Sequence, residues 1–269
     1  MEKLFGKSAY EGISINHVYL RQNLKESSNK ELTVVDVEEE KEKLEITITK
    51  ARDSLLNLKE SLEENNTLGM DINIIDSHLL LLSDPMYIKD IEKEIASRKP
   101  IDIAIEDITN KYVNLFEKIK NPIYRQRQLD IKDVSKRLLD ILHQDDTKYQ
   151  LLDNKILVTK ELFPSELLRI HKEKIHLKGI IMEFGGETSH VAILAKALKI
   201  PTLMGVENIF DHAWNGEIIL DTFDDKVAIL EPTKEILEEY EIKQKQLLKI
   251  EEKIKKIQIY LLLQKTERR

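Results

Sequence analysis

The chain has 269 residues, of which 42 are basic and 49 acidic, so its formal net charge is −7. It contains no cysteine, which excludes disulfides, thiolate metal sites and cysteine nucleophiles. The acidic balance argues against a general nucleic-acid binder, and no apolar run approaches the ~18 residues of a membrane helix. Since no secretory leader is visible either, we expect a soluble, cytoplasmic, helix-rich protein with no membrane partner.

The first element in the chain is a predicted strand. Apolar and polar residues alternate from Ile13 to Leu20, which is typical of a half-buried strand. The period then becomes helical, with apolar residues spaced by four and three at Leu44, Ile48, Ala51, Leu55, Leu58 and Leu62. Further helices are expected over residues 71–82, 86–98, 102–119 and 124–142. These segments, joined by short loops, predict an all-helical bundle.

The second half of the chain has an α/β pattern. Short apolar runs predict strands at residues 155–159, 179–183, 202–205, 217–221 and 226–230. Short helices are expected after Pro164 and over residues 188–198. The strand at Ile13–Leu20 has no sheet neighbour in the bundle, so we infer that it joins the later sheet and that the bundle is an insertion.

Three domains follow from these patterns. Residues 1–30 and 150–233 are expected to form a discontinuous α/β domain, residues 31–149 the helical bundle, and residues 234–269 a C-terminal helix, which the family resemblance given below identifies as a linker helix. The linker helix carries a short heptad seam at Leu247, Ile250, Ile254, Ile257 and Leu261.

The residues with the clearest chemistry run from Gly185 to His190. Two glycines end a strand, Thr188 and Ser189 follow, and His190 opens a helix. Glycine permits positive φ and close approach, and a hydroxyl can cap the helix. The helix N-terminus favours an anion, and a neutral imidazole there is a nucleophile toward phosphorus. The residues alone leave two interpretations open: a phosphoryl site, or a polar histidine at a helix end.

The whole stretch 185–205 resembles the phosphohistidine signature of enzyme I of the phosphoenolpyruvate:sugar phosphotransferase system. The resemblance implies a swivelling α/β phosphohistidine domain with an inserted helical bundle. It also implies a phosphoenolpyruvate-protein phosphotransferase in which phosphoenolpyruvate phosphorylates Nε2 of His190 (tele-phosphohistidine). Thr188 and Ser189 are the expected catalytic neighbours, and Gly185 and Gly186 form the phosphoryl loop.

Three positions depart from the family pattern. Glu187 and Lys196 stand where enzyme I proteins commonly have arginine. Glu187 adds a negative charge beside a site for a dianion, and Lys196 lacks the bidentate fork of arginine. Leu167 replaces a hydroxyl residue that reaches the active histidine in the family, and Ser165 is a possible substitute.

The bundle also resembles enzyme I. Residues 77–85 and 127–139 are similar to the family helices that dock the phosphocarrier protein HPr. Carried over by position, the expected HPr contacts are His78, Leu81, Arg127 and Lys132. Two acidic contact positions of the family are occupied here by Pro85 and Met86.

The resemblance extends from Gly6 to about Leu237 and includes no (β/α)₈ barrel, the domain that binds phosphoenolpyruvate in enzyme I. We therefore expect only the half-reaction with HPr, no metal site, no cofactor in this chain, and a need for Mg²⁺ only with the barrel. Dimerisation is expected to be weak or absent. The alternative is a non-catalytic, decayed paralogue that binds HPr or oligomerises as a scaffold.

Overall fold

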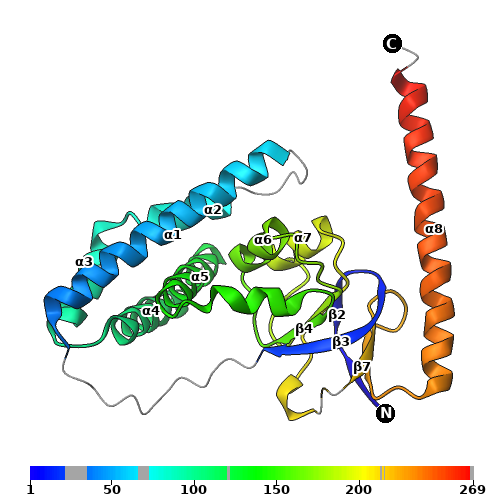
Figure 1. Ribbon diagram of the computed structural model, residues 1–269, viewed down its shortest axis with the longest axis horizontal. Helices are drawn as coiled ribbons and strands as arrows, with labels where there is room; N and C mark the ends of the chain where they lie inside the picture. The colour runs from blue at the N-terminus through cyan, green and yellow to red at the C-terminus, as the bar shows by residue number, and fades with distance from the viewer. Residues whose placement is uncertain (22–34, 66–72, 120–121, 213, 215, 267–269) are drawn as a thin grey trace. The chain divides into compact units, whose positions relative to one another are not determined.

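A computed structural model describes residues 1–21, 35–65, 73–119, 122–212, 214 and 216–266 of the chain. They divide into two compact units (Figure 1). The α/β unit comprises Met1–Asn23, Leu152–Glu161 and His176–Arg269, and the helical unit comprises Leu24–Leu151 and Leu162–Ile175. The sequence-based boundaries put residues 162–175 in the α/β domain, whereas in the structure they pack against the first two helices of the bundle.

The α/β unit is built on one eight-stranded sheet with the order β1-β8-β7-β3-β4-β5-β6-β2. The strands are β1 (Glu2–Phe5), β2 (Lys7–Tyr10), β3 (Ile13–Arg21), β4 (Ile156–Thr159), β5 (Gly179–Met182), β6 (Thr202–Met204), β7 (Glu217–Asp221) and β8 (Val227–Leu230). The neighbouring strands β3, β4, β5 and β6 are parallel, and the other pairs are antiparallel. The central strands β4 and β5 are buried along their whole length, which explains their continuous hydrophobic runs.

Strand β3, near the start of the chain, pairs with two strands from its second half. It pairs in parallel with β4, where Val18 lies opposite Ile156, and antiparallel with β7, where Ile13 lies opposite Asp221. The prediction that residues 13–20 join the later sheet is therefore confirmed. Most of the helical unit, residues 24–151, lies in the sequence between the adjacent strands β3 and β4, and the remainder, residues 162–175, lies between β4 and β5.

The sequence analysis missed β1 and β2, which form the two edges of the sheet. Only Gly6 separates them, so the two edges lie close together and the sheet is strongly curled. A Cβ at Gly6 would lie 2.7 Å from the carbonyl oxygen of Met204, which only glycine avoids.

Within the described residues of the α/β unit there are two α-helices, α7 (His190–Ala197) and α8 (Lys234–Thr266). The first turns of α8 pack on the sheet, where Tyr240 is buried with Ile219 and Ile229. The predicted linker helix is thus partly a structural element of this unit. Its second half extends away from the sheet (red in Figure 1).

The residues of the predicted heptad seam have different environments along α8. Leu247 packs against the sheet cluster, while Ile250 and Ile254 are exposed. The side chains of Ile257 and Leu261 lie outside the described residues.

The helical unit contains α1 (Val37–Asn65), α2 (Asn73–Leu81), α3 (Pro85–Ala96), α4 (Ile101–Glu117), α5 (Pro122–Leu142), the 3₁₀ helix η1 (Asp145–Leu152) and α6 (Pro164–Lys172). The predicted start of α2 near residue 71 lies outside the described residues. Five residues of the apolar stripe of α1 are buried as expected: Leu44, Ile48, Ala51, Leu55 and Leu58. The side chain of Leu62, the sixth residue of the predicted stripe, lies outside the described residues. None of the helices in the described part of the chain is long and apolar enough to cross a membrane.

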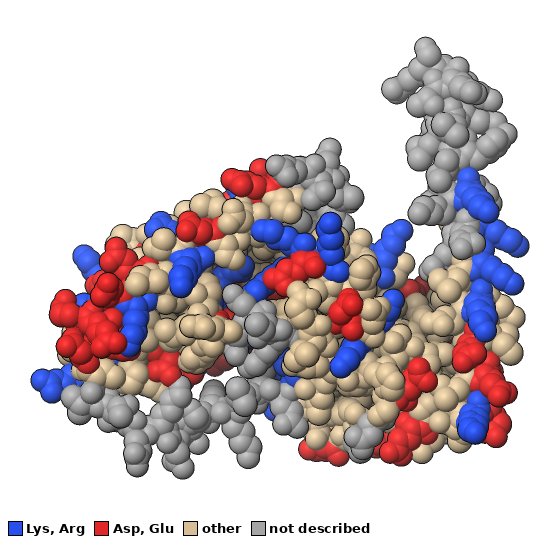
Figure 2. Space-filling model, viewed as in Figure 1, with Lys and Arg blue, Asp and Glu red and all other residues tan. Residues whose placement is uncertain are grey.

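Charge is uneven over the helical unit. Figure 2 shows acidic side chains gathered at the end where α1 begins, and this region includes Glu38, Glu39, Glu42 and Glu92. A partner with an acidic surface would be repelled from this end.

Candidate functional site

The predicted phosphohistidine loop connects β5 to α7. The N–H of Phe184 donates to the carbonyl of Lys160 at 2.9 Å, which holds the chain as it leaves the sheet. Gly185 then adopts φ +137°, a conformation that other residues rarely take, and a Cβ would lie 3.1 Å from Cε of Met182. The backbone therefore requires glycine at position 185.

Gly186 has a different role. No atom lies within 4 Å of the position that a Cβ would occupy at residue 186, so the space beside this part of the loop is open. Its carbonyl accepts a hydrogen bond from the N–H of Ser189 at 2.9 Å. This turn directs the chain into α7.

Ser189 is the N-cap of α7. Its Oγ accepts a hydrogen bond from the N–H of Ala192 at 3.2 Å, and its backbone is extended, as at most N-caps. Thr188 is exposed, and its hydroxyl makes no hydrogen bond to any residue that the structure describes. Of the two hydroxyls that we expected at the site, Ser189 shapes the helix end and Thr188 points to no protein partner there.

His190 is the first residue of α7 and is partly exposed. A helix N-terminus presents N–H groups and the positive end of the helix dipole, so negative charge is favoured beside this imidazole. Val191, Ala192, Leu194 and Ala195 are buried against the unit and anchor the helix. The arrangement offers a partly exposed histidine at the start of a helix that is packed on the unit, next to donors for an anion.

The two charged departures from the family pattern lie at different distances from the imidazole along the chain. Glu187 is exposed in the loop itself. Lys196 is exposed in the last turn of α7, six residues after His190, which corresponds to about 9 Å along the helix axis. Glu187 is therefore the departure that bears directly on the loop.

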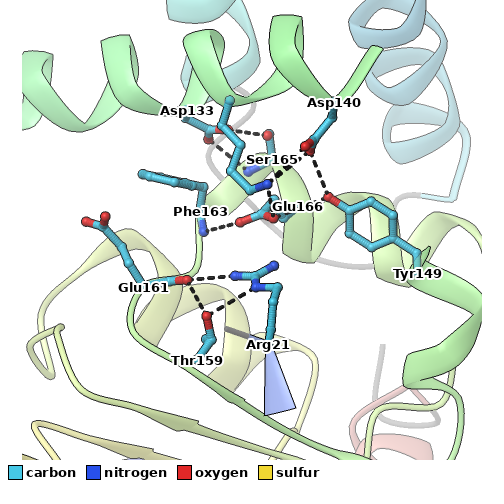
Figure 3. A network of polar contacts seen from close by, with 10 residues as sticks. Arg21, Asp133, Asp140, Tyr149, Thr159, Glu161, Phe163, Ser165 and Glu166 are labelled. Carbon is cyan, nitrogen blue, oxygen red and sulfur yellow. Dashed lines mark hydrogen bonds and ion pairs between the residues drawn. The ribbon is translucent and has the colours of Figure 1, made fainter. Parts of the chain in front are cut away.

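Ser165, considered above as a substitute hydroxyl, has another partner. Its N–H donates to Oδ2 of Asp133 at 3.1 Å, and its hydroxyl makes a short hydrogen bond to Oδ1 of the same carboxylate. Figure 3 shows this pair between α5 and α6. Leu167, which replaces the family hydroxyl, is fully buried in the helical unit.

His78 was expected to contact HPr, and the structure contradicts a direct contact. Only 1% of its surface is exposed, because α2 packs it against α5. Its Nε2 lies 3.7 Å from Oδ2 of Asp133 and 3.8 Å from Oδ1 of Asp130. His78 is thus an interior residue that shares the Asp133 carboxylate with Ser165.

Asp133 is the centre of this buried polar group. Burial raises the pKa of its carboxyl, because the charged form is desolvated, while His78 and the Ser165 hydrogen bonds act in the opposite direction. Sequence reasoning missed Asp133, although it lies within the quoted stretch 127–139.

The other expected HPr contacts lie nearer the surface. Arg127 is exposed, with Nη1 3.8 Å from Oδ2 of Asp130, and Leu81 and Lys132 are half-buried. The most exposed apolar side chains nearby are Leu80 on α2, 69% exposed, and Met86 on α3, 68% exposed. Leu80 was not singled out by the sequence, because a run of four leucines does not reveal which one faces outward.

A second polar group belongs to the α/β unit. Nε of Arg21 donates to Oγ1 of Thr159 at 3.1 Å, and its Nη2 donates to the carbonyl of Glu161 at 2.7 Å (Figure 3). Arg21 ends β3 and Thr159 ends β4, so this contact links the C-terminal ends of two neighbouring parallel strands.

No group of three or more His, Asp or Glu side chains suited to a metal ion occurs within the described ranges.

Comparisons with known protein families match two parts of the chain. Residues 5–127 match the N-terminal domain of the PEP-utilising enzymes, and residues 151–224 match the mobile domain of the same enzymes. The second match contains the whole loop from Gly185 to His190.

Among curated proteins, the phosphoenolpyruvate-protein phosphotransferase of Geobacillus stearothermophilus is 31% identical over 244 residues, and that of Listeria innocua is 33% identical over 245. Each alignment covers 89% of this chain but only 41% and 42% of the relative. The chain thus spans about two fifths of the length of these relatives.

Two solved structures have a similar fold. The solution structure of Enzyme I (nEIt) is 25% identical, with a TM-score of 0.65 over 91% of this chain and 99% of the other. The N-terminal domain of Enzyme 1-Nitrogen is 23% identical, with a TM-score of 0.61 over 88% and 98%. The second likeness concerns the fold alone.

Proposed function

Because the chain belongs to the family of PEP-utilising enzymes and corresponds to the N-terminal part of enzyme I, we propose that His190 carries a phosphoryl group in a sugar phosphotransferase system. The partner in this exchange is a histidine of HPr, and the site of action is the cytoplasm. In the longer relatives the phosphoryl donor is phosphoenolpyruvate, as their name states. For these 269 residues we propose the half-reaction with HPr.

One observation carries the proposal: an accessible histidine opens a helix that Ser189 caps and that a Gly-Gly turn precedes. The N-terminus of this helix, with its free N–H groups and the positive end of its dipole, favours a phosphoryl group on His190. In this proposal Thr188, which is exposed two residues before His190, donates its hydroxyl to a phosphoryl oxygen.

The transfer exchanges one P–N bond for another. The lone pair on Nε2 of His190 attacks the phosphorus of phospho-HPr, the new P–N bond forms, and the old bond breaks with its electron pair returning to the HPr imidazole. Since the bond made and the bond broken are of the same kind, the reaction runs in both directions. We propose that it requires no Mg²⁺, which the resemblance associates with the barrel domain.

HPr docks on the helical unit in this proposal. The docking surface consists of Leu80, Leu81, Met86, Arg127 and Lys132, with the exposed apolar side chains as its centre. Central apolar anchors rimmed by cations are typical of protein interfaces. His78 and Asp133 support this surface from beneath α2.

The test is the intact mass of the chain after incubation with phosphorylated HPr. We expect a gain of about 80 Da, one phosphoryl group, that is lost in acid. His190→Ala should show no gain while still binding HPr. If the wild-type chain binds HPr but gains no mass, the proposal is wrong and the non-catalytic alternative is supported.

A further inference from the structure

The helical unit contains a pocket that the proposed function does not use. It has a volume of about 360 Å³ and is lined by side chains from α1, α5, η1 and α6, together with Glu173, the C-cap of α6. All of these belong to the helical unit, whereas His190 belongs to the α/β unit. The volume is within the range of small-molecule sites.

The carboxylates of the pocket are already partnered. Asp140 accepts from Nζ of Lys136 at 3.1 Å, and Glu166 accepts from the hydroxyl of Tyr149 at 3.2 Å and from the N–H of Phe163 at 2.9 Å (Figure 3). Asp133 accepts both hydrogen bonds of Ser165, as described above.

The fourth carboxylate, Glu173, accepts from Nε of Arg169 at 2.7 Å, and this guanidinium also lies 4.5 Å from the centre of the Tyr149 ring. Two cations of the pocket, Lys136 and Arg169, are therefore engaged by its acids.

Three further cations line the pocket without such a partner. Arg137, on α5, makes one hydrogen bond, from Nη2 to Oγ of Ser54 at 3.3 Å, and its buried Nε has no acceptor among the described residues. Lys50 on α1 and Lys172 on α6 are exposed, and neither forms an ion pair within the described part of the chain.

The guanidinium of Arg137 is under-compensated. Burial lowers its pKa despite the attraction of Asp133 and Asp140, and the nearby charge of Arg169 lowers it further. Arginine remains protonated in proteins, and no ion pair between Arg137 and a carboxylate occurs among the described residues, so this side chain holds a largely buried positive charge that its neighbours compensate only in part. A ligand with negative charge would neutralise it.

We propose that this pocket binds a small phosphate-bearing anion. The guanidinium of Arg137, which lines the pocket, is the kind of group that binds phosphate, and Lys50 and Lys172 add positive charge from two other helices. The pocket joins α1, α5 and α6, so an occupied site would bind these three helices together. The inference does not depend on phosphoryl transfer at His190.

The experiment measures the affinity of the full chain for inorganic phosphate and for glycerol 3-phosphate, by the shift in melting temperature relative to chloride at equal ionic strength. Backbone NMR shifts locate the ligand, and we expect them in α5 and α6. Stronger binding of glycerol 3-phosphate would indicate a phosphomonoester, and equal binding would indicate phosphate itself as the ligand. Both results support the proposal.

Single substitutions distinguish binding in this pocket from a general attraction of anions to positive charge on the protein surface. We expect Lys50→Gln and Lys172→Gln each to weaken binding about two- to fivefold, as for exposed charges, and Arg137→Gln to weaken it about tenfold or more. Lys89→Gln is the matched control, because Lys89 is an exposed lysine of the same unit that does not line the pocket.

Three results would overturn the inference. These are equal melting temperatures in phosphate and chloride, equal weakening by Lys89→Gln and the pocket variants, or loss of binding in His190→Ala with retention in Arg137→Gln. The last result would place the anion at α7 instead. If Arg137→Gln does not fold, the double variant Lys50→Gln/Lys172→Gln decides the question, since both side chains are exposed.

Discussion

The Oγ of Ser189 accepts the N–H of Ala192, so the residue immediately before His190 fixes the first turn of the helix that carries it. Thr188, one residue earlier, has no comparable contact among the described residues. The two adjacent hydroxyls therefore have separable roles, although both were expected to act at the same site.

Ser189→Ala should reduce stability by about 1 kcal/mol, the usual effect of losing an N-cap, and also lower the yield of phosphohistidine. Thr188→Ala should leave stability unchanged and lower only the yield, since its hydroxyl supports no helix. Thermal unfolding and intact mass with phospho-HPr measure both effects. Wild-type yields in both variants would refute the role of this loop in holding the phosphoryl group.

Leu80→Asp should weaken HPr binding at least tenfold without unfolding the bundle, because its side chain is exposed at the centre of the proposed docking surface. Leu115→Asp is the matched control: it introduces the same charge at an exposed leucine of α4. Titration calorimetry with HPr compares the two. Equal affinities for both variants would show that HPr docks elsewhere.

Asp133 should make the helical unit lose stability as the pH rises. Its pKa is raised above the ordinary value of 3.8 in the folded state, so its protonated form stabilises the fold at low pH. That contribution is lost as the pH rises through the raised pKa. The neighbours that influence it, His78, Ser165 and Glu166, are unchanged in Asp133→Asn.

As the pH rises from 4 to neutrality, the free energy of unfolding should therefore fall less in Asp133→Asn than in the wild type. Asparagine keeps an acceptor for the N–H of Ser165 and can donate to its hydroxyl. Urea unfolding at several pH values gives the comparison. Parallel curves for the two proteins would mean that Asp133 has no raised pKa.

The reaction of this 269-residue chain should be limited to HPr. Phospho-HPr should label His190 with or without Mg²⁺, whereas phosphoenolpyruvate should not label it. In enzyme I the barrel domain binds and orients phosphoenolpyruvate, and orientation of the donor supplies several kcal/mol of the barrier reduction. Radiolabelled phosphoenolpyruvate and phospho-HPr make the comparison directly. Labelling by phosphoenolpyruvate alone would contradict this division of the reaction.

Local features of the sequence predicted the backbone geometry of the candidate loop, whereas features that depend on distant contacts were not predicted. The turn at Gly185, the cap at Ser189 and the start of α7 depend on a few consecutive residues. The burial of His78 depends on side chains of α5, far along the chain, which no local pattern reveals.

The edge strands show the same limit. β1 and β2 are four residues long and gain their stability from β8 and β6, which lie about 200 residues further along the chain. Likewise, the helical period of residues 79–82 does not distinguish the exposed Leu80 from the fully buried Leu82. Only the packing of α2 against its neighbours decides which leucine is available to a partner.

The most direct test of the account is to identify the phosphorylated atom by NMR of the chain with ¹⁵N-labelled histidine, after reaction with phospho-HPr. The account predicts one phosphohistidine, with phosphorus bonded to Nε2 of His190, and none in His190→Ala. Phosphorus on Nδ1, on another residue, or on the His190→Ala variant would contradict it.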